Sequence, residues 1–209
     1  MLFNLPNADM GMYPLSVALE VFNDKEPEEM TTLGVKAVKT GQGLQIMGSY
    51  GSGVDVQGAI SARFPCDGFA SVRWGLRGIE EERFVVSGTK ATATIAPRAH
   101  APEHMVLEYH AGEKAGTSEK FSFPLPDLPE GFSSTNYPNS MGFKYEVDAV
   151  SEAIENKQLE CELYTQKHIL TLASMLERAR KAMGVYYPHE SWEQAATVKR
   201  KGPCSCFSA

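Results

Sequence analysis

Residues 54–64 read VDVQGAISARF, and apolar and polar side chains alternate along most of the stretch. A period of two is typical of a β-strand with one face on a core and the other in water. Phe69–Trp74 alternates in the same way after the turn residues Cys66-Asp67-Gly68. Two alternating stretches joined by so short a turn predict an antiparallel hairpin.

More short strands are predicted around this hairpin. The segments with strand character are Val35–Lys39, Arg83–Val86, Ala93–Ile95, Met105–Tyr109 and Lys120–Phe123. Glycine-containing turns separate most of them, and Ser87–Lys90 is a second candidate hairpin turn. Consecutive strands joined by tight turns predict one open, mostly antiparallel sheet from about Leu33 to Phe123.

Helical spacing of apolar residues flanks this run of strands. From Asp9 to Phe22 the pattern centres on Tyr13, Val17 and Val21, with Asp9 as the expected N-cap. Proline is tolerated only in the first helical turn, so Pro14 places the start of the helix near Met10–Tyr13.

Two more helices are predicted after the strands, at Phe143–Asn156 and at Thr165–Met183, where Gly184 is the expected stop. Strands segregated from helices describe an α+β domain with its helices on one face of the sheet. We assign residues 1–188 to this domain and interpret residues 189–209 as a flexible tail.

Composition limits the classes of partner. The formal net charge of −6 argues against nucleic acid, whose phosphates select basic surfaces. No stretch approaches the roughly 20 apolar residues that a membrane-spanning helix needs, and the first residues lack the pattern of a signal peptide. The four cysteines show no metal-type pairing, and so few of them predict a reducing, cytoplasmic location.

Asp9 and Tyr13 are the candidate catalytic pair. They are four residues apart, so a helix would place them on one face, one turn apart. A phenol can donate or accept a proton during a reaction. The alternative is a capping aspartate followed by a half-buried tyrosine, both of which are common in proteins.

Two other patterns predict no ligand site. The glycine-rich stretch Gly48–Gly53 opens a strand, whereas a dinucleotide fingerprint must open a helix, so we interpret it as a hairpin connection. His104 and His110 would share one face of a strand, but about 20 Å apart, too far for one metal ion. No metal site is therefore predicted.

The C-terminal residues Cys206-Phe207-Ser208-Ala209 fit the position of a Cys-a-a-X prenylation motif, and the basic run Lys199–Lys201 precedes them. Cys204 could accept a second lipid. Ser208 is polar where an apolar residue is preferred, so a chance match is the alternative. A membrane partner is expected only if Cys206 is lipidated.

Five segments in order resemble the C-terminal domain of the Gfo/Idh/MocA oxidoreductases, closest to the branch of dimeric dihydrodiol dehydrogenases and NADP-dependent D-xylose dehydrogenases. The segments are Asp9–Leu19, Gly53–Asp55, Ser87–Ile95, Phe143–Val150 and Met175–Pro188. The family usually has glycine where this chain has Ala91. The match covers roughly residues 9–188.

The resemblance implies an NAD(P)-dependent oxidoreductase that acts on the CH–OH group of sugars or trans-dihydrodiols. In that branch a tyrosine at the position of Tyr13 works with a lysine from the nucleotide domain, and Asp9 would help to orient the substrate. The family also dimerises through its open sheet face, so we expect a homodimer, with Phe69, Trp74 and Phe84 or their neighbours on that face.

The Rossmann domain of the family, with its Gly-x-Gly-x-x-Gly fingerprint, has no counterpart in this sequence. A complete family enzyme would use NAD(P), but we expect no cofactor to bind this chain alone and expect the chain alone to be inactive. Either the gene model is truncated or the domain occurs by itself. The alternative function is a non-catalytic, dimerising binding module, anchored to a membrane if Cys206 carries a lipid.

Overall fold

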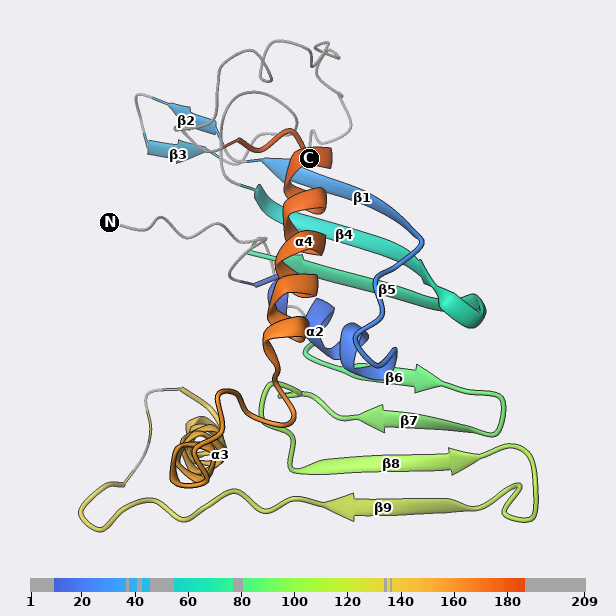
Figure 1. Cartoon of the computed structure of the whole chain (residues 1–209), viewed down its shortest axis with the longest axis vertical. Helices are drawn as coiled ribbons and strands as arrows, with labels where there is room; N and C mark the ends of the chain where they lie inside the picture. The colour runs from blue at the N-terminus through green and yellow to red at the C-terminus, as the bar shows by residue number, and fades with distance from the viewer. Residues whose placement is uncertain are drawn as a thin grey trace, which may run out of the picture. The chain divides into compact units, whose positions relative to one another are not determined.

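The computed structural model describes residues 10–36, 38–40, 43–45, 55–76, 81–133, 135 and 137–186 (Figure 1). The chain divides into two compact units. The first contains residues up to 80 together with those from 164 onward, and the second contains residues 81–163.

The first unit is built on a three-stranded antiparallel sheet in the order β1-β4-β5. Its strands are β1 (Glu29–Lys36), β4 (Asp55–Phe64) and β5 (Gly68–Gly75). Strands β2 (Val38–Thr40) and β3 (Gly43–Gln45) form a separate two-stranded ribbon. The short 3-10 helix η1 (Pro65–Asp67) joins β4 to β5, with Cys66 and Asp67 at positive φ, so the predicted hairpin at this turn is confirmed.

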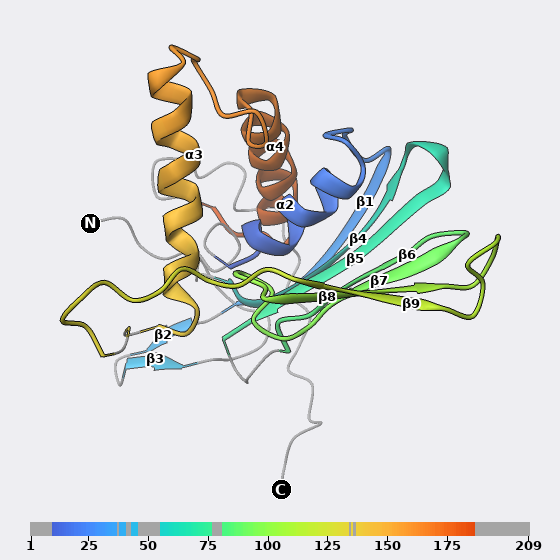
Figure 2. The same ribbon diagram turned by 90° about the horizontal axis from the view of Figure 1, so that it is seen from below.

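Helices α2 (Met12–Val21) and α4 (Gln166–Ala182) cover one face of this sheet (Figure 2). Alternate residues of β4 point into the core beneath them, with Ile60, Ala62 and Phe64 at most 2% exposed. Leu15 and Leu19 of α2 and Leu172 and Met175 of α4 complete this core from the helix side. The period of two read in residues 54–64 is therefore the alternation between core and solvent.

Local signals fix both ends of α4. The hydroxyl of Thr165, its N-cap, accepts a hydrogen bond from the backbone N–H of His168. Gly184, just beyond the helix, takes the left-handed conformation (φ 68°) that glycine adopts without steric cost. The bounds predicted for this helix are confirmed to within one residue.

The second unit contains a four-stranded antiparallel meander, β6-β7-β8-β9. Its strands are β6 (Phe84–Ser87), β7 (Ala91–Ile95), β8 (His104–Tyr109) and β9 (Ser118–Ser122). The hairpin predicted at Ser87–Lys90 is confirmed, since the N–H of Gly88 donates to the carbonyl of Ala91 at 2.9 Å. Helix α3 (Phe143–Glu155) follows the 3-10 helix η2 (Ser140–Gly142).

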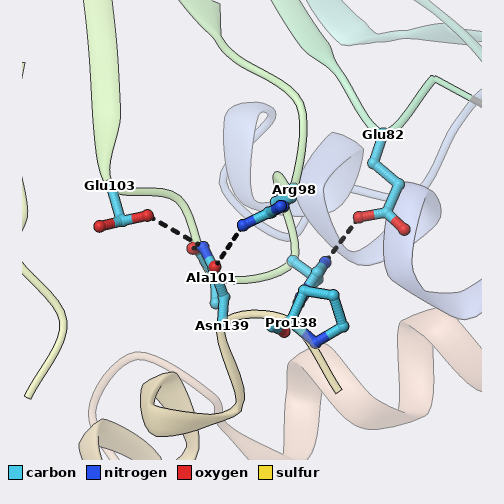
Figure 3. Close-up of polar contacts among 7 residues, drawn as sticks. Glu82, Arg98, Ala101, Glu103, Pro138 and Asn139 are labelled. Carbon is cyan, nitrogen blue, oxygen red and sulfur yellow. Dashed lines mark hydrogen bonds and ion pairs between the residues drawn. The ribbon is translucent and has the colours of Figure 1, made fainter. Parts of the chain in front are cut away.

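A polar network ties the loop after β7 to the segment before α3 (Figure 3). Asn139, in the left-handed conformation, donates to the carbonyl of Ala101 at 2.9 Å and accepts from Arg98 at 3.2 Å. The ring of His100 lies between the carboxylate of Glu82 (2.6 Å) and the carbonyl of Pro138 (3.2 Å). These contacts hold two loops that are about 38 residues apart in the sequence.

The fold class is confirmed as α+β with open antiparallel sheets, but three details of the prediction are wrong. The described strands form separate sheets of three, four and two strands instead of one. The strand predicted at Val35–Lys39 begins earlier, at Glu29. Trp74 is 3% exposed, on the core face of β5, because it lies an odd number of residues from Phe69 and the pleat turns it the other way.

Candidate active site

Tyr13 is the second residue of α2. Tyr13 is exposed, and 53% of its surface is open to solvent. Tyr13 is therefore more open to solvent than the half-buried tyrosine of the alternative interpretation. The first turn of a helix carries backbone N–H groups without intrahelical partners and a partial positive charge, so the phenol stands where a developing negative charge would be stabilised.

Tyr13 is exposed because the core-facing stripe of α2 differs from the predicted one. The buried residues are Leu15, Ala18 and Leu19, whereas Tyr13 and Val21, placed at the centre of the predicted stripe, are exposed. Both sets recur at helical spacing, and the face that carries Leu15 and Leu19 is the one that packs in the core. The N-cap is Gly11 instead of the expected Asp9.

Three predicted features lie outside the described residues: Asp9, the glycine-rich stretch 48–53, and Cys206 with its basic neighbours. The structure thus places one member of the Asp9–Tyr13 pair. Tyr13 remains the candidate proton-transfer residue and Asp9 the candidate orienting residue, both as predictions.

Sequence reasoning missed a part-buried polar network that links Ser16 of this helix to His168 of α4. Ser16 Oγ lies 2.8 Å from His168 Nε2, and His168 Nδ1 lies 2.6 Å from Asp24 Oδ1. Ser16 and His168 are 152 positions apart. The only signal was that His168 shares the apolar face of α4 with Leu172 and Met175, a common place for a structural histidine.

The described residues bring together no group of three or more His, Cys, Asp or Glu side chains suited to a metal ion. Every pair of strands in the described part of the chain is antiparallel. A dinucleotide site of the Rossmann type needs parallel strands and a glycine-rich turn at a helix N-terminus. The described residues therefore do not form a dinucleotide site of the Rossmann type. None of the described helices is long and apolar enough to cross a membrane.

No family model matches the chain. Curated proteins do match. The chain is 28% identical over 183 residues to trans-1,2-dihydrobenzene-1,2-diol dehydrogenase of Sus scrofa, and the match covers 87% of this chain and 47% of that protein. The enzyme of the same name from Oryctolagus cuniculus is 26% identical, with 87% and 48% covered. The chain thus spans about half the length of the curated relatives it matches.

Solved structures agree on the fold. An NAD binding oxidoreductase from Klebsiella pneumoniae matches with a TM-score of 0.58 and 14% identity, over 83% of this chain and 46% of that one. An aldose-aldose oxidoreductase from Caulobacter crescentus, complexed with glycerol, matches with a TM-score of 0.53 and 17% identity, over 82% and 44%. A 3-ketoreductase from Actinomadura kijaniata gives a TM-score of 0.53 at 13% identity over 83% and 46%.

The resemblance drawn from five sequence segments is confirmed: the homologues of this chain are dihydrodiol dehydrogenases, and its structural neighbours are oxidoreductases of the Gfo/Idh/MocA type.

Proposed function

We propose that this chain is the substrate-binding and dimerisation half of an NAD(P)-dependent oxidoreductase that acts on the CH–OH group of sugars or trans-dihydrodiols. The observation that carries the proposal is the half-length match to dihydrodiol dehydrogenases, together with an exposed Tyr13 in the first turn of α2. In this proposal the nucleotide binds to a Rossmann domain, since the described residues form no nucleotide site of that type.

In this proposal Tyr13 takes the proton of the substrate hydroxyl while the carbon that bears it loses a hydride. The bound NAD(P) supplies the hydride acceptor. Tyr13 can reach a substrate because it projects from the helix surface. It accepts the proton as the phenolate and becomes the neutral phenol. Asp9, one helical turn before it in the sequence, would orient the substrate.

The test joins a nucleotide domain from a relative to this chain. Joining the nucleotide domain of a dihydrodiol dehydrogenase to the N-terminal side of Asp9 should give NADP-dependent oxidation of trans-dihydrodiols or D-xylose, measured by absorbance at 340 nm. Tyr13→Phe should then lower kcat by about a hundredfold or more, because a general acid–base group is lost. The bare chain should neither oxidise these substrates nor bind NADPH.

Activity that survives Tyr13→Phe in a folded fusion would assign the proton transfer to another residue. A fusion that folds, binds NADPH and stays inactive on all these substrates would favour the alternative, a non-catalytic binding module. Micromolar binding of NADPH by the bare chain would contradict the division of roles between the two halves.

We further propose that the chain forms a homodimer through the outer face of the β1-β4-β5 sheet. This is the face opposite α2 and α4, and it carries two large apolar residues, Leu33 (74% exposed) and Phe69 (67% exposed). The residues between them are small or polar, including Thr31, Ser61 and Ser71, which pair across the three strands. A second sheet could pack face to face on such a surface, as sheets do in β-sandwiches.

A further inference from the structure

The side chains of Ser16, His168 and Asp24 form a continuous chain of two hydrogen bonds within the first unit. The hydroxyl of Ser16 lies 2.8 Å from one ring nitrogen of His168, and Asp24 lies 2.6 Å from the other. A hydroxyl, an imidazole and a carboxylate joined in this order make up the activated-serine arrangement, which is recognised by geometry and not by position in the sequence.

The imidazole of His168 is held rigidly in this position. The residue is 3% exposed, and the ring of Tyr164 packs against it with 4.6 Å between centroids. When the Nδ1–H donates to the carboxylate of Asp24, the lone pair on Nε2 points at the hydroxyl of Ser16. This tautomer prepares the imidazole to remove the proton of the serine.

Ser16 lies at the border between the core and the solvent. It is half-buried, whereas Leu15 and Leu19 beside it are fully buried. On α2, Tyr13 lies three residues before Ser16 and Glu20 lies four residues after it. Both are exposed. A small reagent can therefore approach from the side of Tyr13. The exposed carboxylate of Glu20, four residues after Ser16, disfavours an anionic reagent.

We propose that Ser16 is an activated nucleophile that accepts the acyl group of small, uncharged carboxylic esters. Oγ of Ser16 forms a bond to the carbonyl carbon of the ester while its proton moves to Nε2 of His168. The bond between that carbon and the alkoxide then breaks, and the alkoxide leaves with the proton from Nε2. The products are an ester on Ser16 and a free alcohol, and no oxidant, reductant or other co-reactant is consumed.

The reactivity is measured by incubating the full chain with p-nitrophenyl acetate and mapping acetylated peptides by mass spectrometry. Ser151, an exposed serine on α3, is the internal control because it is also helical but contacts no histidine among the described residues. Ser16 should become acetylated at least about tenfold faster than Ser151, since an oriented base accelerates proton removal. Equal rates at the two serines overturn the proposal and leave the network as a tie between α2 and α4.

Variants test whether the fast acetylation of Ser16 depends on His168 as a base or only on the exposure of the serine. Ser16→Ala should remove the fast acetylation, and His168→Gln should reduce the rate at Ser16 to that of Ser151 because glutamine cannot accept the proton. Asp24→Asn should lower it by at least about tenfold through loss of the correct tautomer. Circular dichroism checks that each variant is folded. Fast acetylation of Ser16 in folded His168→Gln overturns the proposal, and if that variant does not fold, Asp24→Asn gives the same decision.

Discussion

The indole N–H of Trp74 donates a hydrogen bond to the carboxylate of Asp55 at 2.9 Å, and both side chains are buried beneath the helices of the first unit. The two residues lie on neighbouring strands, β5 and β4. Gly58 of β4 leaves room for the indole, since a methyl group at this position would come within 2.1 Å of the ring. The tryptophan, its carboxylate partner and the glycine thus form one packed unit.

Trp74→Phe should lower the free energy of unfolding by about 1.5–3 kcal/mol, the usual contribution of a buried hydrogen bond to a charged group. The phenyl ring also leaves unfilled space over Gly58, so the loss combines the bond to Asp55 with lost packing. Urea denaturation followed by circular dichroism measures it. Ser151→Ala, at an exposed position of α3, is the control and should change stability by less than about 0.5 kcal/mol.

The orientation of α2 gives a second prediction. Leu15→Ala should cost about 2–5 kcal/mol, because Leu15 is 1% exposed and its removal leaves a cavity in the core. Tyr13→Ala should change stability by less than about 0.5 kcal/mol, because Tyr13 projects into solvent. Both are measured by urea denaturation of the bare chain. A large loss of stability in Tyr13→Ala would mean that the tyrosine has a packing role.

The sequence predicted the strands and helices well where periodicity is long and turns are marked. Residues 54–64 alternate over most of their length, and β4 covers Asp55–Phe64. The bounds of α4 also follow from local signals, namely a capping Thr165 and a stop at Gly184. These features depend on neighbouring residues only.

Relationships between distant residues could not be predicted in this way. The contact of His168 with Ser16 and Asp24 depends on how α4 packs on α2, which no local pattern encodes. The face of α2 that is buried was also ambiguous, since Tyr13-Val17-Val21 and Leu15-Ala18-Leu19 both have helical spacing. The identity of Tyr13 as a candidate came from family resemblance, because spacing alone favours a structural tyrosine.

The proposed dimer gives a third prediction. Leu33→Asp should shift the chain from dimer to monomer in multi-angle light scattering at micromolar concentration, without loss of helical signal. Burying one leucine is worth about 1.5–3 kcal/mol, so its loss raises the dimer Kd at least tenfold. Leu159→Asp is the matched control, because Leu159 is 95% exposed but lies outside the sheet. If both variants remain dimeric, or the unchanged chain is monomeric, the sheet-face interface is wrong.

Glu177 gives a prediction about pH. Its carboxylate accepts hydrogen bonds from the guanidinium of Arg180 at 2.7 Å and forms an ion pair with Lys181 at 2.9 Å. These contacts hold the pKa of the Glu177 carboxyl below its usual value, and the hydrogen bond from Arg180 has the largest effect. A carboxyl whose pKa is lowered by folding stabilises the protein above its unfolded pKa, and this contribution is lost as the pH falls through the folded pKa.

Glu177→Gln should therefore destabilise the chain at pH 7 and have progressively less effect as the pH falls below the ordinary range of a glutamate. Its side chain is 42% exposed, so solvent screening limits the loss at pH 7 to about 0.2–1 kcal/mol. Thermal unfolding of both chains from pH 7 down to pH 3 measures the difference. Glu20→Gln, at an exposed position of α2 with no ion pair among the described residues, should show no such trend. A Glu177→Gln difference that stays constant over this pH range would mean that the carboxylate charge contributes nothing and that the substitution acts through packing alone.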